Sequence, residues 1–242
     1  MLLILSLQST SVDSAHVDGK RRAPRLDPPQ GGQYASPPMQ DPPSRPAPTA
    51  ESVAVNPRIT GLEPLELRSL FGNDNPVILE IGSGKGRFLV RHAEDHPDAN
   101  VLGIEMSLHY HRVIVDRIVR RGIPNVRVVN HDAFLVLQKM LPPQSIQEIH
   151  IYFPDPWPRP REQKRRIIRP AAAIEMNRVL REDGRGWYVT DHRTYFESAV
   201  PVMAAVFEIE SGEIRHDPPR TNYEAKYQKE GRAIFQILFR KR

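Results

Sequence analysis

The sequence predicts an α/β protein in which helices cover both faces of a doubly wound, mostly parallel sheet. Three observations support this prediction. Short apolar runs alternate with amphipathic segments from about residue 58 to the C-terminus. The runs are spaced widely enough for a crossover helix, which parallel strands require and which is right-handed in nearly all proteins. Acidic residues or glycines follow most of the runs, at the strand ends where ligands of such sheets bind.

The elements follow in order from hydrophobic periodicity and from the residues that stop helices. Runs rich in Val, Ile and Leu predict buried strands, and glycine ends several helices because it adopts a left-handed backbone without strain. The expected strands are 75–82, 98–106, 125–132, 146–154, 184–191 and 233–240. The expected helices are 63–72, 86–96, 108–121, 133–141, 170–184 (stopped by Gly184) and 194–207 (interrupted by Pro201).

Residues 1–57 are rich in Pro, Ser, Gln and Gly and lack the period of a helix or a strand, so they predict a disordered tail before a single domain at 58–242. The apolar run at the N-terminus is shorter than the roughly 20 residues that span a bilayer, and no basic region precedes it. We therefore expect no membrane association.

The composition excludes several classes of site. The chain has no cysteine, which rules out disulfides and thiolate metal sites and fits a cytoplasmic protein. Its histidines are scattered without metal-ligand spacing, so we expect no metal. A formal net charge of +5 favours an anionic partner such as nucleic acid. The sequence does not indicate the oligomeric state.

A glycine loop follows the first long strand. EIGSGKG places Gly82, Gly84 and Gly86 between a strand and a helix, with Glu80 directly before them. An acid there repels a phosphate and suits a cation, which fits S-adenosylmethionine because this cofactor carries an ammonium and a sulfonium. Glu105, at the next strand end, can accept both ribose hydroxyls, and Asp132 is placed to meet an adenine amino group.

The segment FPDPWPRPREQKRR combines an acid, an aromatic ring and a basic run. Pro154 and Pro156 restrict the backbone on both sides of Asp155, and Trp157 follows. Residues 159–169 hold six basic residues and one acid, so their net charge of +5 equals that of the whole chain. This concentration of charge favours phosphate contacts, although such runs also occur as solvated faces.

From residue 75 to the C-terminus, the blocks EIGSGKG, IEMS, HDA, FPDPWPRPREQKRR, VTDH and TNYE make the chain similar to the bacterial tRNA (guanine-N7-)-methyltransferases. That resemblance implies the Rossmann-like class I methyltransferase fold and methylation of guanine N7 in the tRNA variable loop. It implies Glu80, Gly82, Gly84, Glu105, Asp132 and Asp155 at the cofactor, with Asp155 also the catalytic acid. It implies substrate contacts from Arg159, Asp191, Thr221, Asn222, Tyr223 and Glu224, and RNA contacts from Arg161, Lys164, Arg165 and Arg166.

The sequence departs from the family pattern at Pro158, Arg159 and Pro160, where a Lys or His is common, and at Glu162 inside the basic run. These departures concern RNA docking more than the reaction. Guanine N7 has a free lone pair, so its methylation needs alignment and stabilisation of developing positive charge rather than a base. Asp155 is the best candidate for that stabilisation, and Asp191 and Glu224 are alternative guanine acceptors.

Other functions remain open on the sequence alone. An amino-group methyltransferase acting on nucleic acid has a related loop at the same strand end, and its product would be stable to alkali. A catalytically silent RNA-binding module or a general basic scaffold would lack methyl transfer, and the scaffold would also lack cofactor binding.

Overall fold

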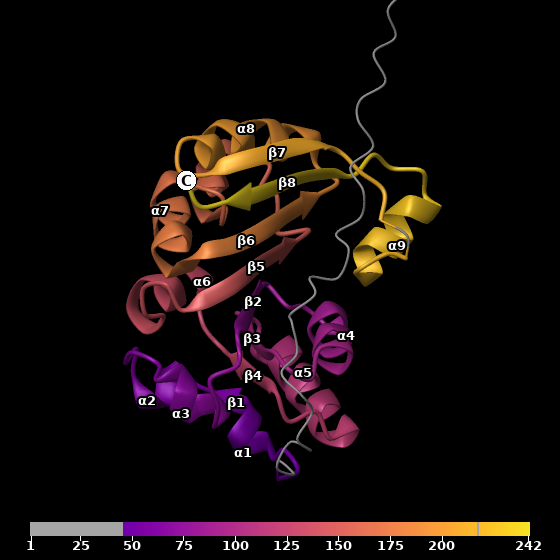
Figure 1. The fold of residues 1–242 in the computed structure, drawn as a ribbon. Coiled ribbons are helices and arrows are strands. Elements are labelled where there is room, and N and C mark those ends of the chain that lie inside the picture. Colours follow the sequence, from indigo (N-terminus) through magenta and orange to yellow (C-terminus); the bar gives the residue numbers. More distant parts are fainter. Residues whose placement is uncertain (1–45, 217) are drawn as a thin grey trace, which may run out of the picture. The chain divides into compact units, whose positions relative to one another are not determined.

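The computed structural model describes residues 46–216 and 218–242, so most of the expected tail lies outside the described residues. In the described part, eight strands form one sheet in the order β1-β4-β3-β2-β5-β6-β8-β7 (Figure 1). The strands are β1 (Ala54–Val55), β2 (Val77–Ile81), β3 (Asn100–Ile104), β4 (Val126–Val129), β5 (Ile146–Tyr152), β6 (Leu180–Thr190), β7 (Glu208–Glu213) and β8 (Phe235–Arg240).

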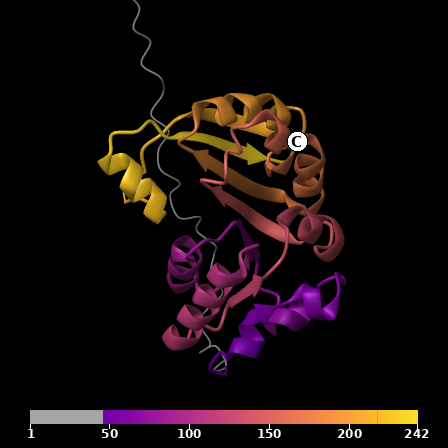
Figure 2. The ribbon, with the colours of Figure 1, turned by 180° about the vertical axis from the view of Figure 1, so that it is seen from behind.

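Helices cover both faces of this sheet, which confirms the doubly wound prediction (Figures 1 and 2). Leu89, Ile114 and Val128 belong to the core under α1, α4 and α5, and Leu79, Met176 and Tyr188 belong to the larger core under α3, α6, α7 and α8. The helices are α1 (Ala50–Val53), α2 (Pro57–Thr60), α3 (Leu67–Phe71), α4 (Arg87–Asp95), α5 (Leu108–Arg121), α6 (Ala133–Leu135) with a π turn η1 (Val136–Met140), a 3-10 turn η2 (Pro160–Arg165), α7 (Pro170–Val179), α8 (Arg193–Ala204) and α9 (Asn222–Lys229).

The order of the strands reverses between β2 and β5. β2 pairs in parallel with β3 on one side and with β5 on the other, and the chain then continues outward through β6. Ligands of such sheets bind in the crevice at the carboxyl ends of the strands beside this reversal. β8 pairs antiparallel with β6, and β7 pairs antiparallel with β8, so the sheet is mostly parallel, as predicted.

Regular structure begins before residue 58, the expected start of the domain. Thr49 caps α1 with a reciprocal capping box to Ser52, and Val53 is completely buried in the core under α5. β1 then pairs in parallel with β4 and adds a strand to the edge of the sheet. The proline-rich composition hid this region, because the capping box and the two-residue strand are too short to produce a periodic pattern.

The helix expected over 170–184 is also too long. α7 ends at Val179, and Leu180 already pairs with Ile146 in the sheet. The register then shifts before Arg185 pairs with Glu148, so the polar residues between Leu180 and Arg185 bulge out of the ladder. A polar bulge inside a strand resembles the end of a helix in sequence, which explains the error.

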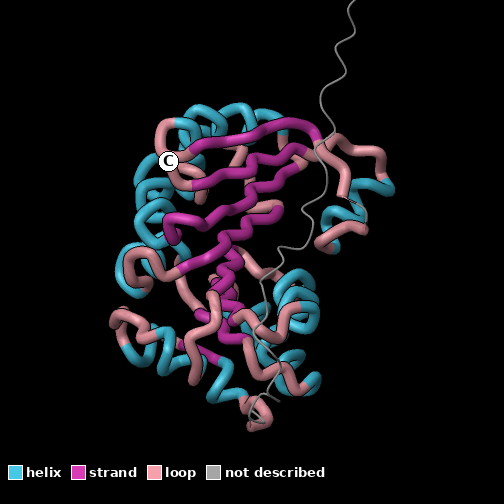
Figure 3. Tube along the Cα trace, in the orientation of Figure 1, coloured by secondary structure: helices cyan, strands magenta, loops and turns pink. Residues whose placement is uncertain are grey.

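Two further differences concern the C-terminal third. Pro201 lies inside α8, so it does not interrupt this helix. β7 was not predicted because its sequence, EIESGE, lacks an apolar face (Figure 3). An edge strand with exposed charges is common, since charge discourages pairing with another chain.

Candidate active site

The glycine loop turns the chain from β2 into α4 with three left-handed residues. Gly82, Gly84 and Gly86 have φ angles of 78°, 53° and 69°. The turn is fastened to the next strand, because the Gly82 N–H donates to the carbonyl of Ile104 at 2.8 Å. Gly86 also lies against α5, where an added Cβ would come within 3.0 Å of Ile114 Cγ1. The loop therefore requires glycine for its backbone and, at Gly86, for packing.

Glu80 lies at the end of β2 with 3% of its surface exposed. Its Oε2 atom has no hydrogen-bond partner among the described residues. Burial, with a smaller contribution from the negative charge of Glu105, raises the pKa of Glu80 to about 8. An unpartnered carboxyl oxygen in this position fits a cationic group that would hydrogen-bond to it and favour its ionised form.

Glu105 follows β3 and connects it to the glycine loop. Its Oε2 accepts the Gly84 N–H at 2.7 Å, and its Oε1 accepts the Ser107 N–H at 2.7 Å. Each ionised carboxylate oxygen has a further lone pair, so both can still accept a hydroxyl. Burial raises the pKa of Glu105, and the charge of Asp155 adds to this effect. The acids from β3 and β5 therefore share the same end of the sheet.

Asp132 has a structural role as well as its predicted one. It follows β4 and caps α6, where its Oδ1 accepts the Leu135 N–H at 3.1 Å. The side chain is exposed, so the cap leaves it accessible from solvent. Its contact with an adenine amino group stays a prediction.

The loop after β5 is held in an unusual backbone conformation. Phe153 and Trp157 have φ angles of 49° and 42°, a region that bulky residues rarely adopt. Between them, Asp155 is exposed. The loop is tied down because Phe153 N–H donates to Val189 O at 2.8 Å and Arg166 Nε donates to Pro156 O at 2.7 Å. Strained backbone fixed by its surroundings is typical of functional sites.

The basic run divides into an exposed group and a buried residue. Arg161, Lys164 and Arg165 are exposed on η2, and Arg165 lies over the Trp157 ring at 4.8 Å. Arg166 is only 7% exposed. Its guanidinium stacks on the Tyr195 ring at 4.5 Å.

Arg166, which was expected to contact RNA, thus faces the protein interior in this structure. Its guanidinium donates to Pro156 O and also to Ser198 Oγ at 3.2 Å, so it connects the loop to α8. Arg159 is exposed, as expected, and lies 3.7 Å from Glu162, which neutralises part of its charge. The feature of the sequence that could have indicated burial of Arg166 is the apolar pair that follows it, Ile167 and Ile168.

The TNYE segment forms the start of α9 rather than a loop. Thr221 caps the helix by accepting the Glu224 N–H at 3.0 Å. Glu224 is completely buried, and its carboxylate accepts the Arg220 N–H at 2.8 Å and also pairs with His216. Glu224, which was expected to contact the substrate, thus holds the turn together from the interior of the protein.

The other predicted substrate residues face different surroundings. Tyr223 is 54% exposed. Asn222 Oδ1 accepts a hydrogen bond from Arg87 Nη1 at 2.7 Å, which joins α9 to the start of α4. Both helices lie toward the same side of the sheet, at the right in Figure 1 and at the left in Figure 2. Asp191, after β6, pairs with Arg232 at 3.1 Å.

Sequence reasoning missed Arg87, Arg220, His150 and Tyr152. Arg220 Nη1 donates to the Tyr152 hydroxyl at 3.2 Å, so the turn before α9 is fixed to β5. The available signal was the alternation of Glu148, His150 and Tyr152 with the isoleucines at 149 and 151 of this strand. Among the residues that the structure describes, no helix is long and apolar enough to cross a membrane. No cluster of three or more His, Cys, Asp or Glu side chains that could hold a metal ion occurs there either.

Comparisons with known proteins identify the family that the chain resembles. Residues 74–237 match a family described as putative methyltransferase. The tRNA (guanine-N(7)-)-methyltransferase of Nitrosomonas eutropha is 36% identical over 183 residues, which cover 74% of this chain and 82% of that protein. The enzyme of the same description from Cronobacter sakazakii is 36% identical over 184 residues, covering 73% of this chain and 77% of that protein.

Solved structures show the same fold at low sequence identity. The 16S rRNA methyltransferase KamB has a TM-score of 0.57 and 13% identity, with 73% of this chain and 93% of that chain covered. The 30S ribosomal A1408 methyltransferase from an uncultured bacterium has a TM-score of 0.52 and 15% identity, with 73% of this chain and 93% of that chain covered.

Proposed function

Because the chain belongs to the tRNA (guanine-N(7)-)-methyltransferase family, we propose that it methylates guanine N7 in the variable loop of tRNA with S-adenosylmethionine as donor. The observation that carries this proposal is the position of Asp155. It is an exposed acid on a constrained loop, beside the strand reversal and close enough to Glu105 to affect its pKa. A tRNA substrate places the reaction in the cytoplasm.

The residues present fit this cofactor. Glu80 offers an unpartnered, buried carboxyl oxygen to the ammonium, and Glu105 offers two oxygens to the ribose hydroxyls. Asp132 stands after β4, where it can accept the adenine amino group. The bound cofactor supplies an electrophilic methyl group on a sulfonium.

Asp155 would act on the guanine rather than remove a proton. Its carboxylate can accept hydrogen bonds from N1–H and the N2 amino group of the base, which adenine cannot offer in the same pattern. As N7 gains a methyl group, positive charge spreads over the ring and strengthens these bonds in the transition state. The constrained backbone at Phe153 and Trp157 holds the carboxylate in place, which reduces the reorganisation needed during the reaction.

The remaining residues support binding of the RNA. Arg161, Lys164 and Arg165 form an exposed basic group on η2, in the same segment as Asp155, where they can contact phosphates. Arg159 and Tyr223 are exposed, so both can contact the bound nucleotide. Asp191 is paired with Arg232 and Glu224 is buried, so of the three acids considered, Asp155 is the one best placed to receive the guanine edge.

The test is transfer of labelled methyl groups to unmodified tRNA, compared with the same tRNA carrying adenine in place of the variable-loop guanine. We expect incorporation only into the first, with a product that is labile to alkali. Equal incorporation into both would reject the proposed base. An alkali-stable product would indicate methylation of an amino group instead.

A further inference from the structure

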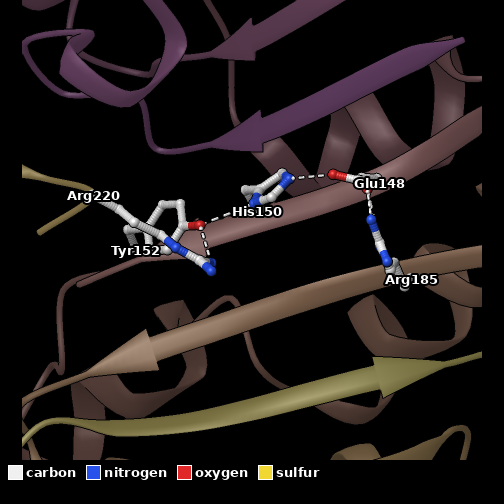
Figure 4. Close-up of polar contacts among 5 residues, drawn as sticks. All are labelled: Glu148, His150, Tyr152, Arg185 and Arg220. Atoms are coloured by element: carbon white, nitrogen blue, oxygen red, sulfur yellow. Dashed lines mark hydrogen bonds and ion pairs between the residues drawn. The ribbon is translucent and has the colours of Figure 1, made fainter. Parts of the chain in front are cut away.

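A chain of polar side chains runs along β5, the strand that leads into the loop of Asp155 (Figure 4). Glu148, His150 and Tyr152 alternate along the strand and therefore point to the same face of the sheet. His150 Nε2 lies 3.0 Å from Glu148 Oε2, and His150 Nδ1 lies 3.0 Å from the Tyr152 hydroxyl. All three residues are buried, so these hydrogen bonds have little competition from water.

Arginines complete the chain at both ends. Arg185 on β6 donates from Nε and Nη2 to Glu148 Oε1, at 3.0 and 2.8 Å. At the other end, Arg220 Nη1 donates to the Tyr152 hydroxyl at 3.2 Å. Figure 4 shows that the five residues form a continuous line, which extends along β5 to the turn before α9.

Charge and burial determine the direction of every hydrogen bond. Burial opposes ionisation of Glu148, but its hydrogen bonds with His150 and Arg185, together with the charge of Arg185, outweigh it and lower its pKa to about 2. Burial lowers the pKa of His150, so the ring is neutral near pH 7. An ionised Glu148 only accepts, which places the imidazole proton on Nε2. Nδ1 must then accept from the Tyr152 O–H, whose oxygen accepts from Arg220.

The rings around His150 prevent it from leaving this orientation. Its ring stacks on Trp187 of β6 at 4.6 Å, with an angle of 10° between the planes. Phe88 of α4 packs against it with a centroid distance of 4.5 Å. The Arg220 guanidinium also lies over the Trp187 ring, at 5.8 Å. The chain of hydrogen bonds is therefore fixed in direction and also in space.

Arg220 connects this chain of hydrogen bonds to the turn at 220–224, where several of the predicted substrate residues lie. Its backbone N–H donates to Glu224 Oε2, and the next residue, Thr221, caps α9. β5 also leads directly into Phe153 and Asp155. The same strand thus holds the proposed catalytic acid through its main chain and the turn at 220–224 through its side chains.

We propose that His150 and Tyr152 are positioning residues that hold Arg220, and with it the turn at 220–224, in register with Asp155 for binding of the target nucleotide. This inference rests on the proposed function, because it takes the turn as part of the tRNA site. Neither side chain touches the reacting atoms in this proposal. Their effect on the reaction passes through Arg220.

A double-mutant cycle tests this proposal. We expect Tyr152→Phe to lower kcat/KM for tRNA by about tenfold, the size of a lost hydrogen bond to a charged group, and to leave KM for the cofactor unchanged. In an Arg220→Ala background the same substitution should change kcat/KM by less than about twofold, since its route of action is already absent. Additive effects, or an equal change in cofactor KM, would overturn the proposal.

Matched variants separate positioning from loss of stability. Tyr188→Phe also removes a buried hydroxyl from the sheet, but on the opposite face, against Tyr195. We expect this control to leave kcat/KM for tRNA unchanged. His150→Gln keeps an acceptor for the Tyr152 hydroxyl and should stay within about threefold of wild type, whereas His150→Phe should match Tyr152→Phe. If His150→Gln and His150→Phe have equal effects, the hydrogen-bond chain does not position Arg220.

Wild-type activity distinguishes the two levels of the proposal. A wild-type chain that binds cofactor and transfers no methyl group to tRNA would overturn the proposed function, and the assignment of the 220–224 turn with it. A wild-type chain that is active while the cycle is additive would overturn the positioning role alone.

Discussion

The two halves of the sheet prepare for their ligands in different ways. On the β2–β4 side, Glu80 and Glu105 are buried, and backbone N–H groups of the glycine loop are engaged with Glu105 or with the neighbouring strand. On the β5–β8 side, Asp155 and the basic group on η2 are exposed. The loop that carries Asp155 is held by the hydrogen bond from the buried Arg166 to Pro156 O. The buried acids of the first half suit a small-molecule ligand. The exposed side chains of the second half suit a large, charged ligand such as RNA.

The largest effect is expected from substitution of Asp155, in the second half of the sheet. We expect Asp155→Asn and Asp155→Ala to reduce kcat by at least about 100-fold, because they remove charge stabilisation in the transition state. Cofactor binding, which depends mainly on the other half, should be partly retained. Single-turnover methyl transfer and equilibrium binding of the cofactor measure the two effects. Near-normal turnover in Asp155→Ala would remove this residue from the mechanism.

The next prediction concerns Glu80 in the first half and the dependence of cofactor affinity on pH. Glu80 has a pKa of about 8 in the cofactor-free protein, so it is protonated near pH 7. Pairing with an ammonium requires the ionised form, and cofactor affinity should therefore rise about tenfold per pH unit up to about pH 8. Calorimetry in buffers of different ionisation enthalpy would detect the released proton. Glu80→Gln should remove this dependence, while an unchanged pH profile in that variant would assign it to another group.

The same shift has a consequence for stability. Between the unfolded pKa of 4.5 and the folded pKa of about 8, the folded protein binds one more proton at Glu80 than the unfolded chain. Its contribution to the free energy of unfolding is therefore complete below pH 4.5 and falls as pH rises through 8. Denaturant unfolding of wild type and Glu80→Gln across this range should show a difference with that sign. A difference that grows as pH rises would contradict it.

A smaller effect concerns the backbone of the glycine loop. Gly86→Ala introduces a side chain at a φ of 69° and within 3.0 Å of Ile114, so we expect a loss of about 1–3 kcal/mol in stability. Gly212 on β7 provides the control, because nothing lies within 4 Å of an added Cβ there and its φ is not left-handed. Chemical denaturation of both variants measures the contrast. Equal losses would show that packing against Ile114 is not tight.

The smallest effect distinguishes an exposed arginine, Arg165, from a buried one, Arg166, by the salt dependence of tRNA binding. Arg165→Ala should weaken tRNA binding and reduce the slope of log affinity against log salt by about 0.7–0.9, the value for one phosphate contact. Arg166→Ala should leave that slope unchanged and lower the melting midpoint, because its guanidinium is buried against Tyr195. Titrations at several salt concentrations, with thermal unfolding, test both. A changed slope in Arg166→Ala would place it at the RNA after all.

Much of the central sheet could be predicted from the sequence. The strands from β2 to β6 combine apolar runs with glycine or acid at their ends, and α5 has a serine cap and a glycine stop that fix both boundaries. Glu80, Glu105 and Asp155 could be predicted to lie at one edge of the sheet, because parallel topology brings the carboxyl ends of strands together. These features depend on local pattern and a general rule, so a single sequence suffices.

The direction in which polar side chains point was not predictable. Arg165 and Arg166 are neighbours in a basic run, yet one is exposed and the other stacks on Tyr195 from α8. Glu224 is buried, and His216 and the Arg220 N–H provide hydrogen-bond partners for its carboxyl group. β1 and β7 acquire strand structure from pairing with β4 and β8 rather than from their own sequence. Each case depends on a partner that is remote along the chain or outside the local pattern.

The hairpin formed by β7 and β8 has a consequence for insertions. Glu213 pairs with Phe235, and the Ile214 N–H donates to Ile234 O at 2.8 Å, so the segment between them, including α9, leaves and rejoins the sheet at one point. Lengthening a loop whose ends are already joined costs little, since closure entropy grows only with the logarithm of its length. Insertions in this segment should therefore disturb the sheet little, whereas the contacts of Arg220 with Tyr152 and of Asn222 with Arg87 limit how far the turn before α9 can change.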